Sequence, residues 1–219
     1  MSRGHDGVVQ FADRADAGRV LAEALRPGRW CDPLVLGLAR GGVPVAHEVA
    51  RALGAGLDVA VARKIGAPGH REFGVGAVTA DGEPIFDADA LRSLGLTPDD
   101  LAGTCAAERR EARRRLEVYR SGRAVRLSGR DVLVVDDGLA TGVTARAALR
   151  EVRSRAPRRL VLAVPVGAAQ ALRQLRGEAD RVVCPHRRDD FRSVGRFYRR
   201  FDQTTDAEVL ALLEQHRHD

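Results

Sequence analysis

The stretch Val132-Leu-Val-Val-Asp-Asp-Gly-Leu-Ala-Thr-Gly-Val-Thr144 combines the features that decide the fold around it. Its four apolar residues, 132–135, predict a strand buried on both faces, as in a parallel sheet. Asp136 and Asp137 follow at the carboxyl end of this strand, and a loop of small residues then leads into an alanine-rich helix pattern. A strand, an acidic pair, a glycine loop and a helix N-terminus together indicate a phosphate site in an α/β protein.

The loop after the strand has the chemistry of an anion-binding loop. Gly138 and Gly142 permit φ > 0 and close approach, so the backbone N–H groups of residues 138–142 can surround an anion. Thr141 and Thr144 add hydroxyl groups. No lysine follows the glycine, which excludes a Walker loop, and the glycine spacing differs from that of a dinucleotide-binding loop. The alternative is a plain strand–turn–helix connection in which the aspartates cap the helix.

This motif resembles the signature of the type I phosphoribosyltransferases, a strand ending in two acidic residues followed by a loop that closes in Thr-Gly. The resemblance implies an α/β fold, a mostly parallel sheet flanked by helices, with a flexible loop and a small hood. It also implies that Asp136 and Asp137 bind the ribose hydroxyls of phosphoribosyl diphosphate (PRPP) and that residues 138–144 bind its 5-phosphate. Mg²⁺ is the implied cofactor, bound mainly through PRPP and water, with no direct protein ligand.

Two basic segments complete the predicted site. Ala39-Arg40-Gly41-Gly42 ends the first strand, and the resemblance assigns it to the diphosphate, whereas alone it would read as a glycine turn with a solvated arginine. Arg63 and Lys64 end the next strand and could reach the leaving diphosphate. The residues expected to bind PRPP are Arg40, Gly41, Arg63, Lys64, Asp136, Asp137, Gly138, Leu139, Ala140, Thr141, Gly142 and Thr144, and those expected to be catalytic are Lys64, Arg40 and Asp137.

Strand and helix patterns alternate along the chain, which predicts a parallel sheet with helices on both faces. Expected strands are 33–38, 57–62, 132–135, 160–164 and 181–184, and expected helices are 13–25, 43–53, 97–119, 143–155, 168–175 and 205–215. The glycine-rich stretch 64–82 predicts a long mobile loop that runs into short strands near 75–78 and 84–86.

At 219 residues we expect a single domain, 1–219, with a core of about 13–184, a hood implied by the resemblance at about 185–203 and a C-terminal helix. No run of 18 apolar residues and no signal peptide is visible, so we expect a cytoplasmic protein without a membrane partner. Three widely separated cysteines predict neither a disulfide framework nor a zinc site.

The net charge of +6 would suit a polyanionic partner. However, Lys64 is the single lysine among 36 Lys and Arg residues, which indicates a coding bias toward arginine and weakens the case for nucleic acid. The same bias makes Lys64 informative, although chance would also explain one surviving lysine. The arginine run at 109–115 fits a solvated helix face better than a nucleic-acid patch.

These observations together favour a pentosyltransferase, a glycosyltransferase of nucleotide metabolism that moves ribose 5-phosphate from PRPP to a small-molecule acceptor and releases diphosphate. Ala140 stands where relatives that act on 6-oxopurines usually have Asp, so the acceptor is expected to be another nitrogenous base. The alternative is a non-catalytic PRPP sensor that acts through nucleic acid or a protein partner. The sequence leaves open whether the protein forms a homodimer. It also leaves open the roles of His70, Arg71 and the aromatic residues at 191–201.

Overall fold

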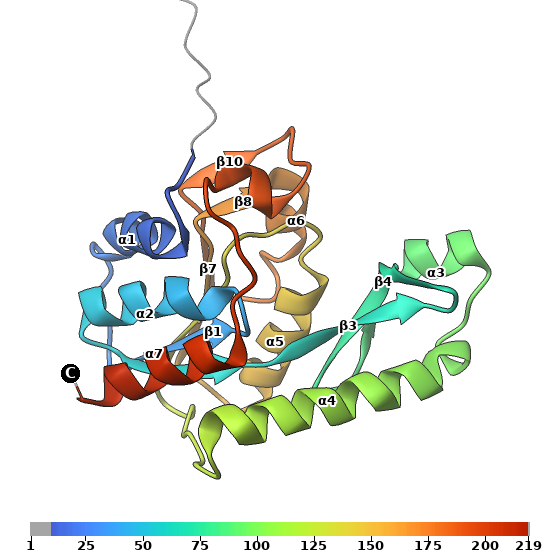
Figure 1. The fold of residues 1–219 in the computed structure, drawn as a ribbon, viewed down its shortest axis with the longest axis horizontal. Coiled ribbons are helices and arrows are strands. Elements are labelled where there is room, and N and C mark those ends of the chain that lie inside the picture. The colour runs from blue at the N-terminus through green and yellow to red at the C-terminus, as the bar shows by residue number, and fades with distance from the viewer. Residues whose placement is uncertain (1–9, 219) are drawn as a thin grey trace, which may run out of the picture.

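A five-stranded parallel sheet forms the centre of the molecule (Figure 1). The structure is a computed structural model that describes residues 10–218, apart from the side chains of residues 70–73 and 218. The strands of the sheet lie in the order β2 (Gly56–Ala60), β1 (Pro33–Leu38), β6 (Asp131–Val135), β7 (Arg159–Ala163) and β9 (Arg181–Val183). They are the five apolar segments predicted from the sequence, so the α/β fold with a mostly parallel sheet is confirmed.

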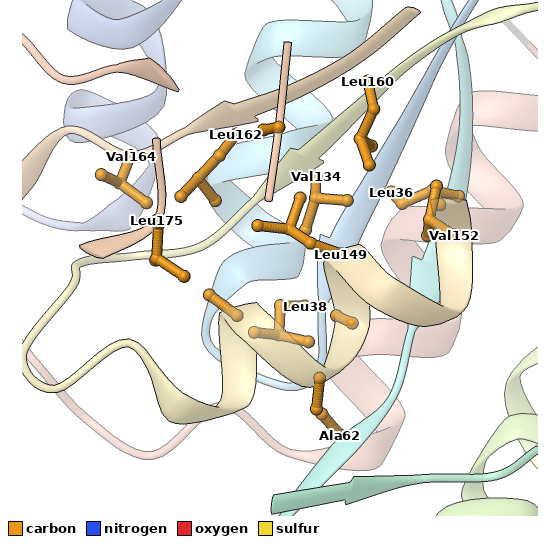
Figure 2. Packing of buried hydrophobic residues seen from close by; sticks show 14 of the residues in the cluster. Leu36, Leu38, Ala62, Val134, Leu149, Val152, Leu160, Leu162, Val164 and Leu175 are labelled. Carbon is orange, nitrogen blue, oxygen red and sulfur yellow. The ribbon is translucent and has the colours of Figure 1, made fainter. Parts of the chain in front are cut away.

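Alternate side chains of each strand enter two separate cores, because neighbouring residues of a strand point to opposite faces of the sheet. Figure 2 shows one core, where Leu36, Val134 and Leu162 meet Leu149 and Val152 of α5 (Val143–Ser154). The opposite core holds residues of α1 (Arg14–Leu25), α2 (Gly42–Leu53) and the other strand face. Both sheet faces are therefore covered by helices, which explains why the strands are continuously apolar.

The strand order changes direction between β1 and β6. From β1 the chain passes through α2 to β2 on one side, whereas from β6 it passes through α5 to β7 on the other side. The register pairs Gly37 with Val135, so both strands end side by side. In open α/β sheets ligands bind at this kind of switch point, outside the carboxyl ends of the strands.

The short strands expected near 75–78 and 84–86 are confirmed, but the long loop expected from residue 64 is instead part of a strand hairpin. β3 (Ala62–Ala67), β4 (His70–Thr79) and β5 (Ile85–Phe86) form an antiparallel sheet, which extends to one side in Figure 1. Ile65 and Val75 are fully buried, so this antiparallel sheet contributes to a hydrophobic cluster of its own. Gly76 accommodates the neighbouring strand, since an added Cβ would collide with the carbonyl oxygen of Ile85.

Three helical segments line this sheet: α3 (Ala88–Leu94), η1 (Asp99–Leu101) and α4 (Ala102–Arg120). The helix predicted over 97–119 is thus a short 3₁₀ turn followed by α4. The sequence pattern did not predict α3. The second strand also ends earlier than expected, because β2 stops at Ala60 and Ala62 already belongs to β3.

Beyond β7, the chain forms a small layer over the carboxyl edge of the sheet. It contains β8 (Val166–Ala168), α6 (Ala169–Gln174), β10 (His186–Arg188) and η2 (Val194–Phe197), with β8 and β10 paired in parallel. The last helix, α7 (Asp206–His218), begins with a capping box, in which Thr205 and Glu208 exchange hydrogen bonds. No described helix is long and apolar enough to cross a membrane.

Candidate functional site

A cavity of about 1100 Å³ opens at the carboxyl ends of β1 and β6. Its walls come from the loops that follow these strands, from α1 and α4, from the β3–β4 hairpin and from the segment before α7. The residues that line it are Arg14, Leu38, Ala39, Arg40, Gly41, Ala62, Arg63, Lys64, Gly66, Ala67, Pro68, Gly69, Gly103, Thr104, Ala107, Glu108, Arg115, Asp136, Asp137, Thr144, Gln203 and Thr204.

Seven of the twelve residues predicted to bind PRPP share this cavity: Arg40, Gly41, Arg63, Lys64, Asp136, Asp137 and Thr144. They come from segments that are far apart in the sequence. Residues 138–142 form the rest of the predicted loop and do not line the cavity wall. The three residues expected to be catalytic, Lys64, Arg40 and Asp137, all lie on it.

Two glycines after β1 allow the loops of β1 and β6 to touch. A Cβ added to Gly42 would lie 2.5 Å from the carbonyl oxygen of Val135, and one added to Gly41 would collide with the Asp137 carboxylate. Any larger side chain would therefore push the two loops apart. This requirement explains the pair of glycines directly after Arg40.

Asp136 and Asp137 lie next to each other in a poorly solvated position. Burial and the neighbouring charge of Asp137 raise the pKa of Asp136 well above its ordinary value, against the opposing charges of Arg14 and Lys64. Burial also raises the pKa of Asp137, and Arg14 counteracts this increase. Carboxylates that are costly to ionise in a cavity indicate a functional site, since hydroxyl donors or a cation would relieve the cost.

The loop after β6 differs in detail from the expected anion-binding loop. Only Gly142 has a positive φ, of 79°, whereas Gly138 is required for close approach, because its Cβ would lie 2.6 Å from Val194. The N–H of Leu139 donates to the carbonyl oxygen of Val166 at 3.0 Å, so this group does not face an anion. Gly142 is the N-cap residue of α5, which begins at Val143 as expected.

Arg40 follows a cis peptide bond with Ala39 and extends toward the start of α7. Its guanidinium lies 3.6 Å from the carboxylate of Asp206, which also accepts a hydrogen bond of 2.5 Å from the hydroxyl group of Tyr119. That hydrogen bond and the nearby arginines lower the pKa of Asp206. The sequence pattern placed α7 but gave no signal for this contact, because the partners are far apart in the chain.

The two basic residues of β3 differ in their surroundings. Arg63 donates to the carboxylate of Glu108 at 2.8 Å, so a phosphate would have to compete with an existing pair. Lys64 is exposed and has no carboxylate within ion-pair distance among the described residues. Lys64 is therefore the cation in the cavity that is best placed to take a new anionic partner. The side chains of His70 and Arg71, whose roles the sequence left open, lie outside the described part of the structure.

The aromatic residues at 191–201 pack against the body instead of lining the cavity. Phe197 and Tyr198 are buried, Phe191 stacks on Phe197, and Tyr198 packs against Phe11 near the start of the described chain. The hydroxyl group of Tyr198 donates to the backbone oxygen of Asp137 at 2.5 Å. Through Tyr198, this aromatic cluster contacts the backbone of the acidic pair.

The described residues contain no group of three or more His, Cys, Asp or Glu side chains arranged to hold a metal ion. The cavity wall carries three carboxylates, those of Asp136, Asp137 and Glu108, of which Asp137 already pairs with Arg14 and Glu108 with Arg63. Mg²⁺ commonly uses one or two carboxylates together with substrate phosphates and water. The donor set therefore fits a cation that is carried by a phosphorylated ligand.

Comparison with known proteins assigns the chain to a family. The sequence model of the phosphoribosyl transferase domain matches residues 11–201. A protein named "Putative phosphoribosyl transferase" in two strains of Mycobacterium tuberculosis is 45% identical over 213 residues, which are 95% of this chain and 47% of that protein. The chain thus spans about half the length of these curated relatives. The crystal structure of TT1426 from Thermus thermophilus superposes with a TM-score of 0.78 at 46% identity, covering 94% of this chain and 98% of that one. The chain therefore belongs to the phosphoribosyl transferase domain family.

Proposed function

We propose that this chain transfers ribose 5-phosphate from PRPP to a nitrogenous base other than a 6-oxopurine and releases diphosphate. The observation that carries the proposal is the switch point between β1 and β6. There the Arg40-Gly41 loop, the acidic pair and Lys64 line one cavity. Cationic side chains suit the phosphates of PRPP, and the carboxylates suit its ribose hydroxyls.

In this proposal Asp136 and Asp137 hold the ribose while the bond from C1 to the diphosphate oxygen breaks. The sugar passes through an oxocarbenium-like state, and negative charge grows on the leaving diphosphate. Arg40 and Lys64 stabilise that charge, and the remaining contacts orient the base toward C1. Thr144 and the start of α5 receive the 5-phosphate, where the helix dipole favours an anion.

A magnesium ion bound through PRPP and water would neutralise part of the diphosphate charge. Asp136 and Asp137 would accept hydrogen bonds from the ribose hydroxyls. Ala140 offers no carboxylate to a base nitrogen, which by family resemblance disfavours guanine, hypoxanthine and xanthine. The acceptor would enter between the β3–β4 hairpin and α4, where Gly103, Thr104 and Ala107 leave space.

Calorimetric titration of PRPP with Mg²⁺ tests the proposal. The double variant Asp136→Asn/Asp137→Asn should bind at least about tenfold more weakly, since hydrogen bonds to charged groups contribute roughly 1.5–3 kcal/mol each. A matched control is Asp189→Asn/Asp190→Asn, which changes two consecutive exposed aspartates outside the cavity. The control should bind PRPP like the unaltered protein.

Equal PRPP affinity in both double variants and the unaltered protein would refute the ribose assignment. Turnover is then measured with a panel of bases, by release of diphosphate. Binding without turnover by any base would instead support a PRPP sensor.

A further inference from the structure

Arg14 occupies a position that its own helix disfavours. It is the first residue of α1, where the partial positive charge of the helix N-terminus repels a cation and favours Asp or Glu. Its side chain is nevertheless only 13% exposed. Contacts outside the helix must therefore account for the position of this arginine.

Those contacts all lead to the acidic pair and to the segment beside it. Arg14 Nε donates to Asp137 Oδ2 at 2.9 Å, and its Nη1 donates to the carbonyl oxygen of Asp202 at 2.6 Å. The guanidinium carbon lies 4.0 Å from the centre of the Phe201 ring, within the range of a cation–π contact. The side chain is thus fixed at three points.

The backbone around Arg14 is also fixed. Residues 11–12 pair with residues 197–200, through hydrogen bonds from the N–H of Phe11 to Phe197 and from the N–H groups of Arg199 and Arg200 back to Phe11 and Ala12. This pairing brings Phe201 and Asp202 to the start of α1. Tyr198, in the same segment, donates to the backbone oxygen of Asp137.

We propose that Arg14 is a positioning residue of the ribose subsite, which holds the Asp137 carboxylate in one orientation and in its charged form. Gly41 belongs to the same arrangement, because a Cβ there would meet both the carboxylate of Asp137 and, at 3.3 Å, Arg14 Nε. The guanidinium takes one carboxylate oxygen and leaves the other free for a ribose hydroxyl. This inference rests on the proposed function, since it needs PRPP as the ligand.

The charges around Asp137 set the expected pH dependence. Asp136 lies in the same loop and repels the charge of Asp137. Lys64 of β3 and the hydroxyl group of Tyr198 also interact with the acidic pair. Glu208 of α7 interacts with Arg14. Among these groups Arg14 is the one that directly counteracts the burial of Asp137, and it lowers the pKa of both aspartates. Removing Arg14 should raise both pKa values, so PRPP binding should fail at a higher pH than in the unaltered protein.

The test is the affinity for PRPP with Mg²⁺, measured by calorimetry between about pH 5.5 and 8.5, in Arg14→Met and Arg14→Lys. Arg14→Met should bind about tenfold more weakly at pH 7.5, as expected for one lost charge-assisted hydrogen bond. Its acid limb, the low-pH range in which PRPP binding is lost, should also move to higher pH. Arg14→Lys should restore the acid limb but not the full affinity, because an ammonium group cannot make the two-point contact of the fork. Arg19→Met, on an exposed turn of the same helix, is the control and should match the unaltered protein.

A purely structural role would lower the melting temperature of Arg14→Met and leave the acid limb where it is, which would overturn the inference. If Arg14→Met does not fold, Arg14→Lys decides alone, and full affinity in that variant would overturn the inference. If the unaltered protein does not bind PRPP at any pH, the proposed function itself fails, and the two failures are thereby distinguished.

Discussion

At the scale of single residues, Lys64 is the cavity cation with the clearest expected role in turnover. It has no carboxylate partner among the residues that the structure describes, whereas Arg14, Arg40 and Arg63 each contact one. If Lys64 meets the diphosphate mainly as charge develops, Lys64→Ala should lower kcat by about tenfold or more while changing PRPP affinity much less. Steady-state kinetics with an identified base and calorimetry separate the two effects.

The matched variant at this position is Lys64→Arg, which keeps the charge. It should recover part of the turnover, since the planar guanidinium is broader than an ammonium group and places its charge differently. Full recovery of both turnover and binding would show that position 64 needs only a positive charge, and the special role of lysine would be abandoned.

At the scale of elements, the β3–β4 hairpin forms one wall of the cavity, on the side proposed for the acceptor. Pro68 and Gly69 at its turn line the cavity, so bound PRPP should restrain the turn. We expect PRPP with Mg²⁺ to slow tryptic cleavage after Arg71 by several-fold. Arg123, in the exposed segment after α4, is an internal control whose cleavage should not change. Equal cleavage after Arg71 with and without ligand would indicate a hairpin that does not respond to PRPP.

The helices and strands also show how much of the fold and of the cavity could be predicted from the sequence. Continuous apolar runs located all five strands of the parallel sheet, and one such run ends in the acidic pair that lines the cavity. The strands near 75–78 and 84–86 were expected, but the pairing of 62–67 with 70–79 was missed, because Gly66, Gly74 and Gly76 read as loop composition although all three lie in strands. Arg14 and Asp206 were missed as site residues because their partners are distant in the sequence, and no local pattern reports such contacts.

At the scale of the whole molecule, the acidic pair should cost the protein stability at neutral pH. Burial raises the pKa of Asp136 well above its value in the unfolded chain. Between the two pKa values the folded state holds a proton that the unfolded state has lost, so stability falls as the pH rises through this window. Asp131 and Asp180 behave in the opposite way, because arginine partners lower their pKa values. The stability that their charged forms contribute is lost as the pH falls into the acid range.

Asp136→Asn isolates the first effect, because the other groups are common to both proteins. The amide oxygen can still accept the hydrogen bond that Asp137 N–H donates to Asp136 Oδ1 at 2.9 Å, and no charge has to be buried. The variant should melt higher than the unaltered protein at pH 8, by about 2–4 °C for each kcal/mol gained, and this difference should shrink as the pH falls toward 5. Thermal melts across this range, with Asp189→Asn as the exposed control, test the expectation.

A variant that melts lower at pH 8, or with a difference that does not depend on pH, would show that the ionised Asp136 is not the destabilising group. A more stable variant that no longer binds PRPP would show that this carboxylate is kept for ligand binding at the expense of the fold.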